Sequence, residues 1–120
     1  MSENQSIDPK AIEALRALSP GGGTEFLREL VDIYLQDTPV RLTELELALA
    51  RQDAPTATRA AHTIKGSSGN FGALRLARLA AEIEVFGKAA NLSAATAATP
   101  ALKAEYVQVA QTLTHMVAGN

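Results

Sequence analysis

Apolar side chains recur along most of the chain at the three- and four-residue spacing of an amphipathic helix, and no segment alternates with the two-residue spacing of a strand. Asp8 and Pro9 predict the first helix start, because aspartate caps helix N-termini and proline is favoured at the first helical position. The clearest break follows at residues 19–23, where serine, proline and three glycines predict a loop. A short helix is therefore expected before this loop, and residues 1–6 are expected to be disordered. The apolar positions of this short helix are Ile12, Leu15 and Leu18.

A longer apolar stripe begins after Thr24, which can cap a helix, and continues to about Arg51. Pro39 interrupts the stripe, and a proline inside a helix removes one backbone hydrogen bond and clashes with the carbonyl four residues earlier. Because the stripe resumes in phase beyond Pro39, one long kinked helix is favoured, with two separate helices as the alternative. The stripe consists of Phe26, Leu27, Leu30, Val31, Tyr34, Leu35, Leu42, Leu45 and Leu49.

The second half of the chain predicts three more helices. The third is expected over about residues 53–70, because it begins with an aspartate able to cap it, and Gly72 can adopt the left-handed backbone that ends a helix. Apolar spacing predicts a fourth helix over about residues 74–90. Residues 91–99 are rich in Ala, Ser and Thr and show no clear pattern, so the last helix is expected to start at Pro100.

Four of these five helices are long and are joined by short loops. They predict an all-α protein, an antiparallel up-down-up-down four-helix bundle with a short extra N-terminal helix. Residues 1–120 are expected to form one domain, because this length suits a single hydrophobic core. Aromatic residues make up only 4% of the chain, which also favours helix over sheet.

Charge and composition exclude several classes of function. A net charge of -2, with both signs interspersed, lacks the basic surface of a nucleic-acid-binding protein. The absence of cysteine excludes disulfides, thiol catalysis and cysteine-ligated metals. No apolar stretch is long enough to span a bilayer, and the N-terminus lacks a signal pattern. The expectation is a cytoplasmic monomer that binds neither nucleic acid nor membrane.

The segment over residues 59–73 is unusual, because it is expected to be mostly helical and yet contains several glycines. A glycine inside a helix costs roughly 1 kcal/mol relative to alanine, so these glycines need a reason. We interpret them as leaving room for another surface to approach His62, with helix contacts inside the bundle as the alternative. The residues that share a helix face with His62 are Arg59, Lys65, Gly66 and Gly69. The other stripe is suited to the core and consists of Ala57, Ala61, Ile64, Ser68 and Phe71.

An exposed imidazole can be a metal ligand, a general base or a nucleophile. A metal site at His62 is disfavoured, because His115 is the only other histidine and no Glu-x-x-His pair occurs. A serine hydrolase is also disfavoured, because Ser68 falls on the core stripe and Ser67 lies well around the helix from His62.

A nucleophile that accepts a phosphoryl group fits His62 better. Lys65 and Arg59 lie one turn to either side and would offset the phosphate charge. A histidine nucleophile also needs an acceptor that holds its second ring nitrogen and so fixes the tautomer. In an antiparallel helix pair, Glu84 comes within about one turn of the level of His62, and Glu82 competes for this role.

The chain resembles the family of histidine-containing phosphotransfer (HPt) domains. Its signature is matched by His62-Thr-Ile-Lys65-Gly66-Ser67-Ser68, followed by Gly72-Ala73-Leu74. The apolar pattern over residues 24–49, including its proline, also resembles the long second helix of that family. The resemblance covers about residues 7–90 in order and spacing.

This resemblance implies a role for each matching residue. His62 would be the phosphorylated residue, and Lys65 would steady the phosphoryl group. Gly66 would leave room for the partner protein. Glu84 matches the position where family members carry Gln or Glu bonded to the other imidazole nitrogen.

The resemblance also implies a function in multistep phosphorelays. His62 would accept a phosphoryl group from the phospho-aspartate of a receiver domain, for example in a hybrid sensor kinase, and pass it to the receiver of a response regulator. The receiver would supply Mg²⁺, and the chain itself would need no cofactor and have no kinase activity. The alternative is a non-catalytic helical adaptor.

Docking of a receiver calls for apolar anchors beside His62. The candidates are Ile12, Leu15, Phe26 and Leu30, and the alternative is that all four belong to the core.

The alternative for Glu84 is that it is a solvated surface carboxylate without a role at the site. His115 is expected to be structural or solvated.

Overall fold

Five α-helices make up the computed structural model of the chain, which describes residues 6–19, 21 and 23–118. The helices are α1 (Pro9–Ala17), α2 (Glu25–Ala50), α3 (Ala54–Asn70), α4 (Leu74–Lys88) and α5 (Leu92–Ala118). Within the described residues no strand occurs, which confirms the all-α prediction. The disorder expected for residues 1–6 lies outside the described part except at Ser6, which is a buried bend residue.

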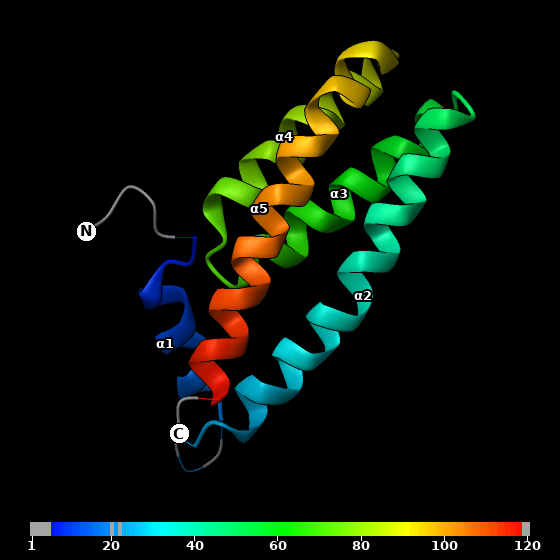
Figure 1. Cartoon of the computed structure of the whole chain (residues 1–120). Helices are drawn as coiled ribbons and strands as arrows, with labels where there is room; N and C mark the ends of the chain where they lie inside the picture. Colours follow the sequence, from blue (N-terminus) through cyan, green and yellow to red (C-terminus); the bar gives the residue numbers. More distant parts are fainter. Residues whose placement is uncertain (1–5, 20, 22, 119–120) are drawn as a thin grey trace.

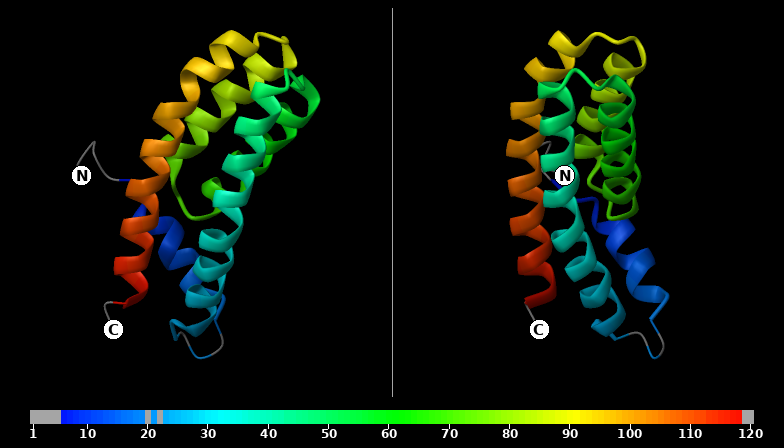
Figure 2. Two further views of the ribbon diagram at one scale, coloured as in Figure 1. Left: turned by 45° about the vertical axis from the view of Figure 1, so that its right-hand side comes forward. Right: turned by 90° about the vertical axis from the view of Figure 1, so that its right-hand side faces the viewer.

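Helices α2 to α5 form the up-down-up-down bundle that the sequence predicts (Figure 1). Each packs against the next along the chain, and α5 closes the bundle against α2. The α3–α4 pair is shorter than the α2–α5 pair, and α1 fills the space below the α3–α4 turn (Figure 2). The backbone N–H of Asp8 donates to the carbonyl of Gly72 at 2.9 Å, which fixes the start of α1 to that turn.

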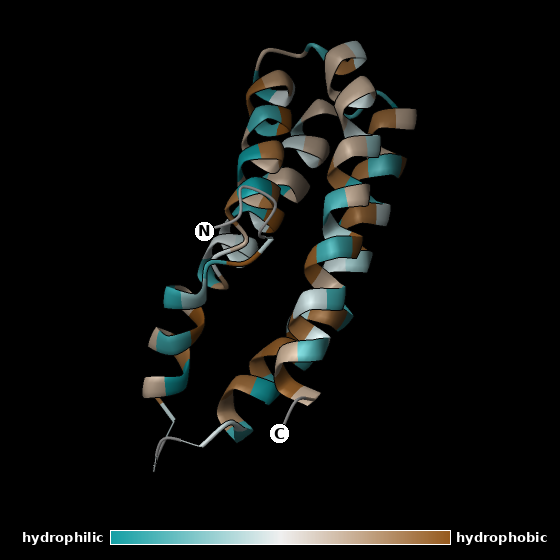
Figure 3. Cartoon of the chain, turned by 60° about the vertical axis from the view of Figure 1, so that its left-hand side comes forward, coloured by the Kyte–Doolittle hydropathy of each residue, from teal (hydrophilic) through white to brown (hydrophobic). Residues whose placement is uncertain are grey.

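The core follows the stripes of the sequence, and hydrophobic and hydrophilic residues alternate along each helix (Figure 3). Burial of such side chains is the main stabilising contribution to a bundle of this size. The largest fully buried apolar side chains are Leu27, Leu45, Ile64, Leu76, Ile83, Leu102 and Leu113, with Val31 and Val109 beside them.

Helix α2 runs unbroken through Pro39, so the prediction of one long helix is confirmed over that of two. Thr24 is the N-cap residue of α2, as predicted, but its side chain makes no capping hydrogen bond to the helix. The cap predicted for α3 is present, since Asp53 Oδ1 accepts from the Thr56 N–H at 3.2 Å. Gly72 has a φ of 71°, as expected for a residue that ends a helix.

The predicted start of the last helix at Pro100 is wrong, because α5 begins at Leu92 and continues through that proline. Asn91 precedes the helix and accepts the Ala94 N–H on its side chain at 3.2 Å. The alanine-rich segment that follows has high helix propensity, and it buries Ala95 and Thr99 against the bundle. These contributions outweigh the backbone hydrogen bond that Pro100 removes.

Candidate functional site

His62 lies in the middle of α3 and points away from the core, with 65% of its side chain exposed. Its orientation follows from the small apolar stripe on the opposite side of α3, which fixes the rotation of the helix. The buried residues of that stripe are Ala57, Ala60, Ala61, Ile64 and Ser68. A hydrogen bond of 2.7 Å between the hydroxyls of Ser68 and Tyr34 adds a polar tie from α3 to α2.

Glu84 lies on α4 directly opposite His62. Its Oε2 atom is 2.8 Å from His62 Nδ1, and its side chain is only 7% exposed. Glu82, the competing candidate, is exposed to solvent. The structure therefore places Glu84 as the acceptor beside the imidazole and excludes the reading of Glu84 as a solvated surface carboxylate.

The second oxygen of Glu84 is held by Lys65. The Nζ atom of Lys65 is 2.7 Å from Glu84 Oε1, and the Nζ atom of Lys88 is 3.4 Å from Glu84 Oε2. The hydrogen bond from Lys65 lowers the pKa of Glu84 to about 2, with a smaller contribution from His62, although burial opposes the shift. The carboxylate is thus ionised at neutral pH and accepts from both the imidazole and an ammonium group.

This geometry leaves one ring nitrogen of His62 available. A carboxylate is an acceptor only, so the hydrogen bond to Glu84 places a proton on Nδ1 of the imidazole. In the neutral imidazole the lone pair then lies on Nε2. An exposed imidazole with a fixed tautomer is suited to act as a nucleophile towards a group brought by another molecule.

Lys88 is a contact that the sequence reasoning missed. The signal was present, since Lys88 follows Glu84 by four residues on one helix, the spacing of an i,i+4 ion pair. Arg59, which is predicted to offset the phosphate charge together with Lys65, donates to Thr56 Oγ1 at 3.3 Å in this structure. Lys65 is therefore the cation of α3 that binds the same carboxylate as the imidazole.

Gly66 and Gly69 face open space. A Cβ atom built at either position would have no atom within 4 Å outside its own helix. The alternative that these glycines allow helices of the bundle to pack closely is therefore wrong. The surface of α3 next to His62 is left without side-chain bulk, as expected for a site that another surface approaches.

The four candidate docking residues divide into two groups. Ile12 is only 3% exposed and belongs to the core, so its assignment as a docking anchor is wrong. It was misassigned because α1 buries this side chain against the bundle end. Leu15, Phe26 and Leu30 are half-buried. Leu15 and Leu30 line a cavity of about 310 Å³ between α1, α2 and α3, together with Ile33, Ser67, Asn70 and Phe71.

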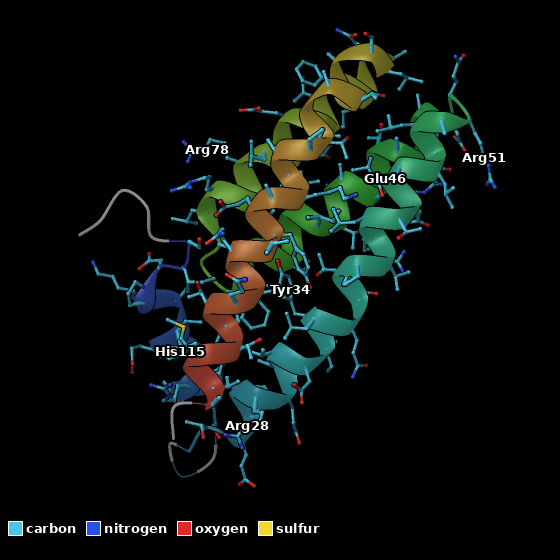
Figure 4. All side chains as sticks on the ribbon, viewed as in Figure 1. Arg28, Tyr34, Glu46, Arg51, Arg78 and His115 are labelled. Atoms are coloured by element: carbon cyan, nitrogen blue, oxygen red, sulfur yellow. The ribbon has the colours of Figure 1, made fainter. Side chains whose placement is uncertain are left out.

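The remaining polar candidates have structural surroundings. The Ser67 hydroxyl donates to the backbone carbonyl of Thr63 on its own helix at 3.0 Å. His115 is exposed near the C-terminal end of α5, on a different helix from the residues of the α3–α4 site (Figure 4).

Over the described ranges, no three His, Asp or Glu side chains come together as a metal-binding group. No described helix combines the length and apolar character that crossing a membrane requires.

Comparisons with known proteins agree with this geometry. The family described as Hpt domain matches residues 29–112 of the chain. The crystal structure of histidine-containing phosphotransfer protein B (HptB) from Pseudomonas aeruginosa PAO1 is similar, with a TM-score of 0.88 and 25% sequence identity. The similarity covers 98% of this chain and 99% of that one. Comparison with curated protein sequences gives no match.

Proposed function

We propose that this chain, which belongs to the Hpt domain family, carries a phosphoryl group on His62 between two receiver domains of a phosphorelay. The observation that supports this most directly is the bond from His62 Nδ1 to the buried Glu84 at 2.8 Å. It leaves Nε2 as the nucleophilic nitrogen of an imidazole that is 65% exposed. The similarity to a phosphotransfer protein along nearly the whole chain supports the same function.

In the proposed reaction, the lone pair on His62 Nε2 attacks the phosphorus of a receiver aspartyl phosphate. The bond between phosphorus and the aspartate oxygen breaks, and its electron pair returns to that carboxylate. The proton on Nδ1 stays in place, so the phosphorylated ring carries a positive charge beside Glu84. Transfer to the second receiver follows the reverse path, in which the aspartate of that receiver attacks and His62 leaves as the neutral imidazole.

Charge and space around His62 support this reaction. Lys65 and Lys88 are anchored at Glu84, from where their ammonium groups can interact with the phosphoryl oxygens. Transfer requires the phosphorus of the donor's aspartyl phosphate to come within bonding distance of Nε2, and the bare surface at Gly66 and Gly69 allows that approach.

The receiver is expected to dock over the cavity between α1, α2 and α3. Leu15 and Leu30 line this cavity, and the exposed Ile33 and the half-buried Phe26 extend its apolar character. We further propose a cytoplasmic monomer without kinase activity of its own. The receiver, whether from a hybrid sensor kinase or a response regulator, would bring the Mg²⁺ that the transfer uses.

Phosphotransfer profiling tests this function. The purified chain is incubated with each phosphorylated receiver domain of its source organism, and transfer of the label is followed over time. We expect rapid transfer from at least one receiver and onward transfer to another. A chain that binds receivers and takes up no label from any of them would instead be the helical adaptor considered as the alternative.

Replacement of Gly66 by glutamine distinguishes an effect on the approach of the partner from an effect on the stability of the bundle. A side chain here projects into open space, and glutamine has higher helix propensity than glycine by roughly 0.5–1 kcal/mol. We expect transfer to slow by about tenfold or more, while the urea midpoint of unfolding stays constant or rises. Gly66→Ala is the matched control and should slow transfer much less. Unchanged transfer in Gly66→Gln would show that the partner does not approach over this residue.

A further inference from the structure

Gly87, in the last turn of α4, is a helical glycine that packs directly against another helix. A Cβ atom at this position would overlap Thr58 Oγ1 of α3 and would lie 3.3 Å from Thr58 Cβ and 3.4 Å from Thr58 Cα. Thr58 cannot easily turn away, because its hydroxyl donates to the Ala54 carbonyl at 2.7 Å. The glycine is therefore required by the space between α3 and α4, in contrast to Gly66 and Gly69.

The position of this contact connects it to the functional site. Thr58 precedes His62 by four residues on α3, and Gly87 follows Glu84 by three residues on α4. Residues three or four apart lie one turn apart on the same helix face. The Gly87–Thr58 contact and the Glu84–His62 bond therefore lie one turn apart in the interface between α3 and α4. They are separated by about 5 Å along the helices.

We infer that Gly87 is a positioning residue, which sets the α3–α4 separation at which Glu84 reaches His62. This inference rests on the proposed function and adds a residue to its site. Any side chain at position 87 would push α4 away from α3 one turn from Glu84. The distance of 2.8 Å between Nδ1 and Oε2 lies near the ideal value, and a separation larger by several tenths of an ångström would weaken the bond.

The consequence for chemistry is indirect. Gly87 has no side chain that could touch the phosphoryl group, and it would act only through the acceptor that fixes the imidazole tautomer. Loss of that acceptor would leave the proton free to move to Nε2, where it blocks the lone pair that attacks phosphorus. Lys88 would move together with α4, so its distance from the site would also change.

A glycine swap across the contact tests this inference. The variants are Gly87→Ala, Thr58→Gly and the double variant that carries both, in which the glycine of this contact lies on α3 in place of α4. Nitrogen NMR of the His62 imidazole in the free protein measures the Nδ1–H tautomer, and transfer from a phosphorylated receiver measures the rate. We expect Gly87→Ala to lose the Nδ1–H signature and to slow transfer by about tenfold, and the double variant to recover both.

Gly69→Ala is the matched control for the NMR measurement, because it also adds one methyl group to a helical glycine but meets no neighbour. It should keep the Nδ1–H signature. If Gly87→Ala does not fold, the inference is tested by the double variant alone. A double variant that does not fold, or that lacks the Nδ1–H signature, overturns the inference. A Gly87→Ala protein that is destabilised but retains the signature also overturns it, since Gly87 would then serve packing only. The NMR result needs no receiver, so failure of the proposed function would appear separately, as absence of transfer in the wild-type protein.

Discussion

Replacing His62 with glutamine should abolish labelling of the chain by every phosphorylated receiver that labels the wild-type protein. Glutamine keeps a polar side chain at a position that is 65% exposed, but it has no nucleophilic ring nitrogen. The bundle should stay folded, because His62 contributes no buried apolar surface and the core stripe of α3 is untouched. Transfer from a radiolabelled phospho-receiver, followed by gel electrophoresis, measures the loss, and circular dichroism measures retained helicity.

The chain provides a matched control in its second histidine. His115→Gln removes an imidazole from an exposed position on α5 and should leave labelling at the wild-type level. The label on the wild-type chain should be lost in acid and survive in base, as expected for a phosphoramidate. Labelling that persists in His62→Gln, or that disappears in His115→Gln, would assign the phosphoryl group to a different residue and remove the basis of the proposed function.

The sequence identified the histidine more securely than the groups around it. His62, Lys65 and Gly66 lie within five positions of one helix, so their relative placement follows from helix geometry alone. Glu84 lies on another helix, and its level depends on where the α3–α4 turn reverses the chain. A shift of two residues in that turn would have favoured Glu82, which is why spacing left both candidates open.

Contacts between helices explain what the sequence does not reveal about Gly87 and why the predictions for Ile12 and Pro100 are wrong. Gly66 and Gly69 resemble Gly87 in sequence, yet only Gly87 meets a neighbouring helix, and the packing partner of a glycine cannot be read from its own segment. The same reason applies to Ile12, whose burial depends on how α1 docks below the bundle. Local propensity predicts a helix start at Pro100, whereas burial against the bundle extends α5 back to Leu92.

Removing the Glu84 carboxylate should slow phosphotransfer far more than replacing it by an amide. Glu84→Ala removes the acceptor for His62 Nδ1 and leaves Lys65 without its ion-pair partner. The imidazole then loses its fixed tautomer, and the positive charge of the phosphorylated ring is no longer offset. We expect transfer to slow by a factor of about 10–100, which is typical when a group that orients a functional histidine is lost.

Glu84→Gln should have an intermediate effect for a reason specific to this site. Both carboxylate oxygens of Glu84 are used, Oε2 by His62 and Oε1 by Lys65, whereas an amide has one acceptor oxygen and an NH₂ group that only donates. Because the imidazole and the lysine meet different oxygens of Glu84, the single amide oxygen can stand at only one of these two places. We expect it to keep the His62 bond and to release Lys65 towards the phosphoryl group, so that transfer slows by less than about tenfold.

Three measurements on the variants distinguish orientation of the imidazole from general stability. Nitrogen NMR should detect the Nδ1–H tautomer of His62 in the wild-type protein and in Glu84→Gln, and its loss in Glu84→Ala. Time courses of transfer from one receiver should give the same order of rates, and urea unfolding should show that all variants are folded under the assay conditions. Glu82→Ala is the matched control, since it removes an exposed carboxylate from the same helix and should leave tautomer and rate unchanged. Equal rates in wild-type protein and Glu84→Ala would mean that the short bond to His62 makes no contribution to transfer, and that the imidazole is oriented by the receiver instead.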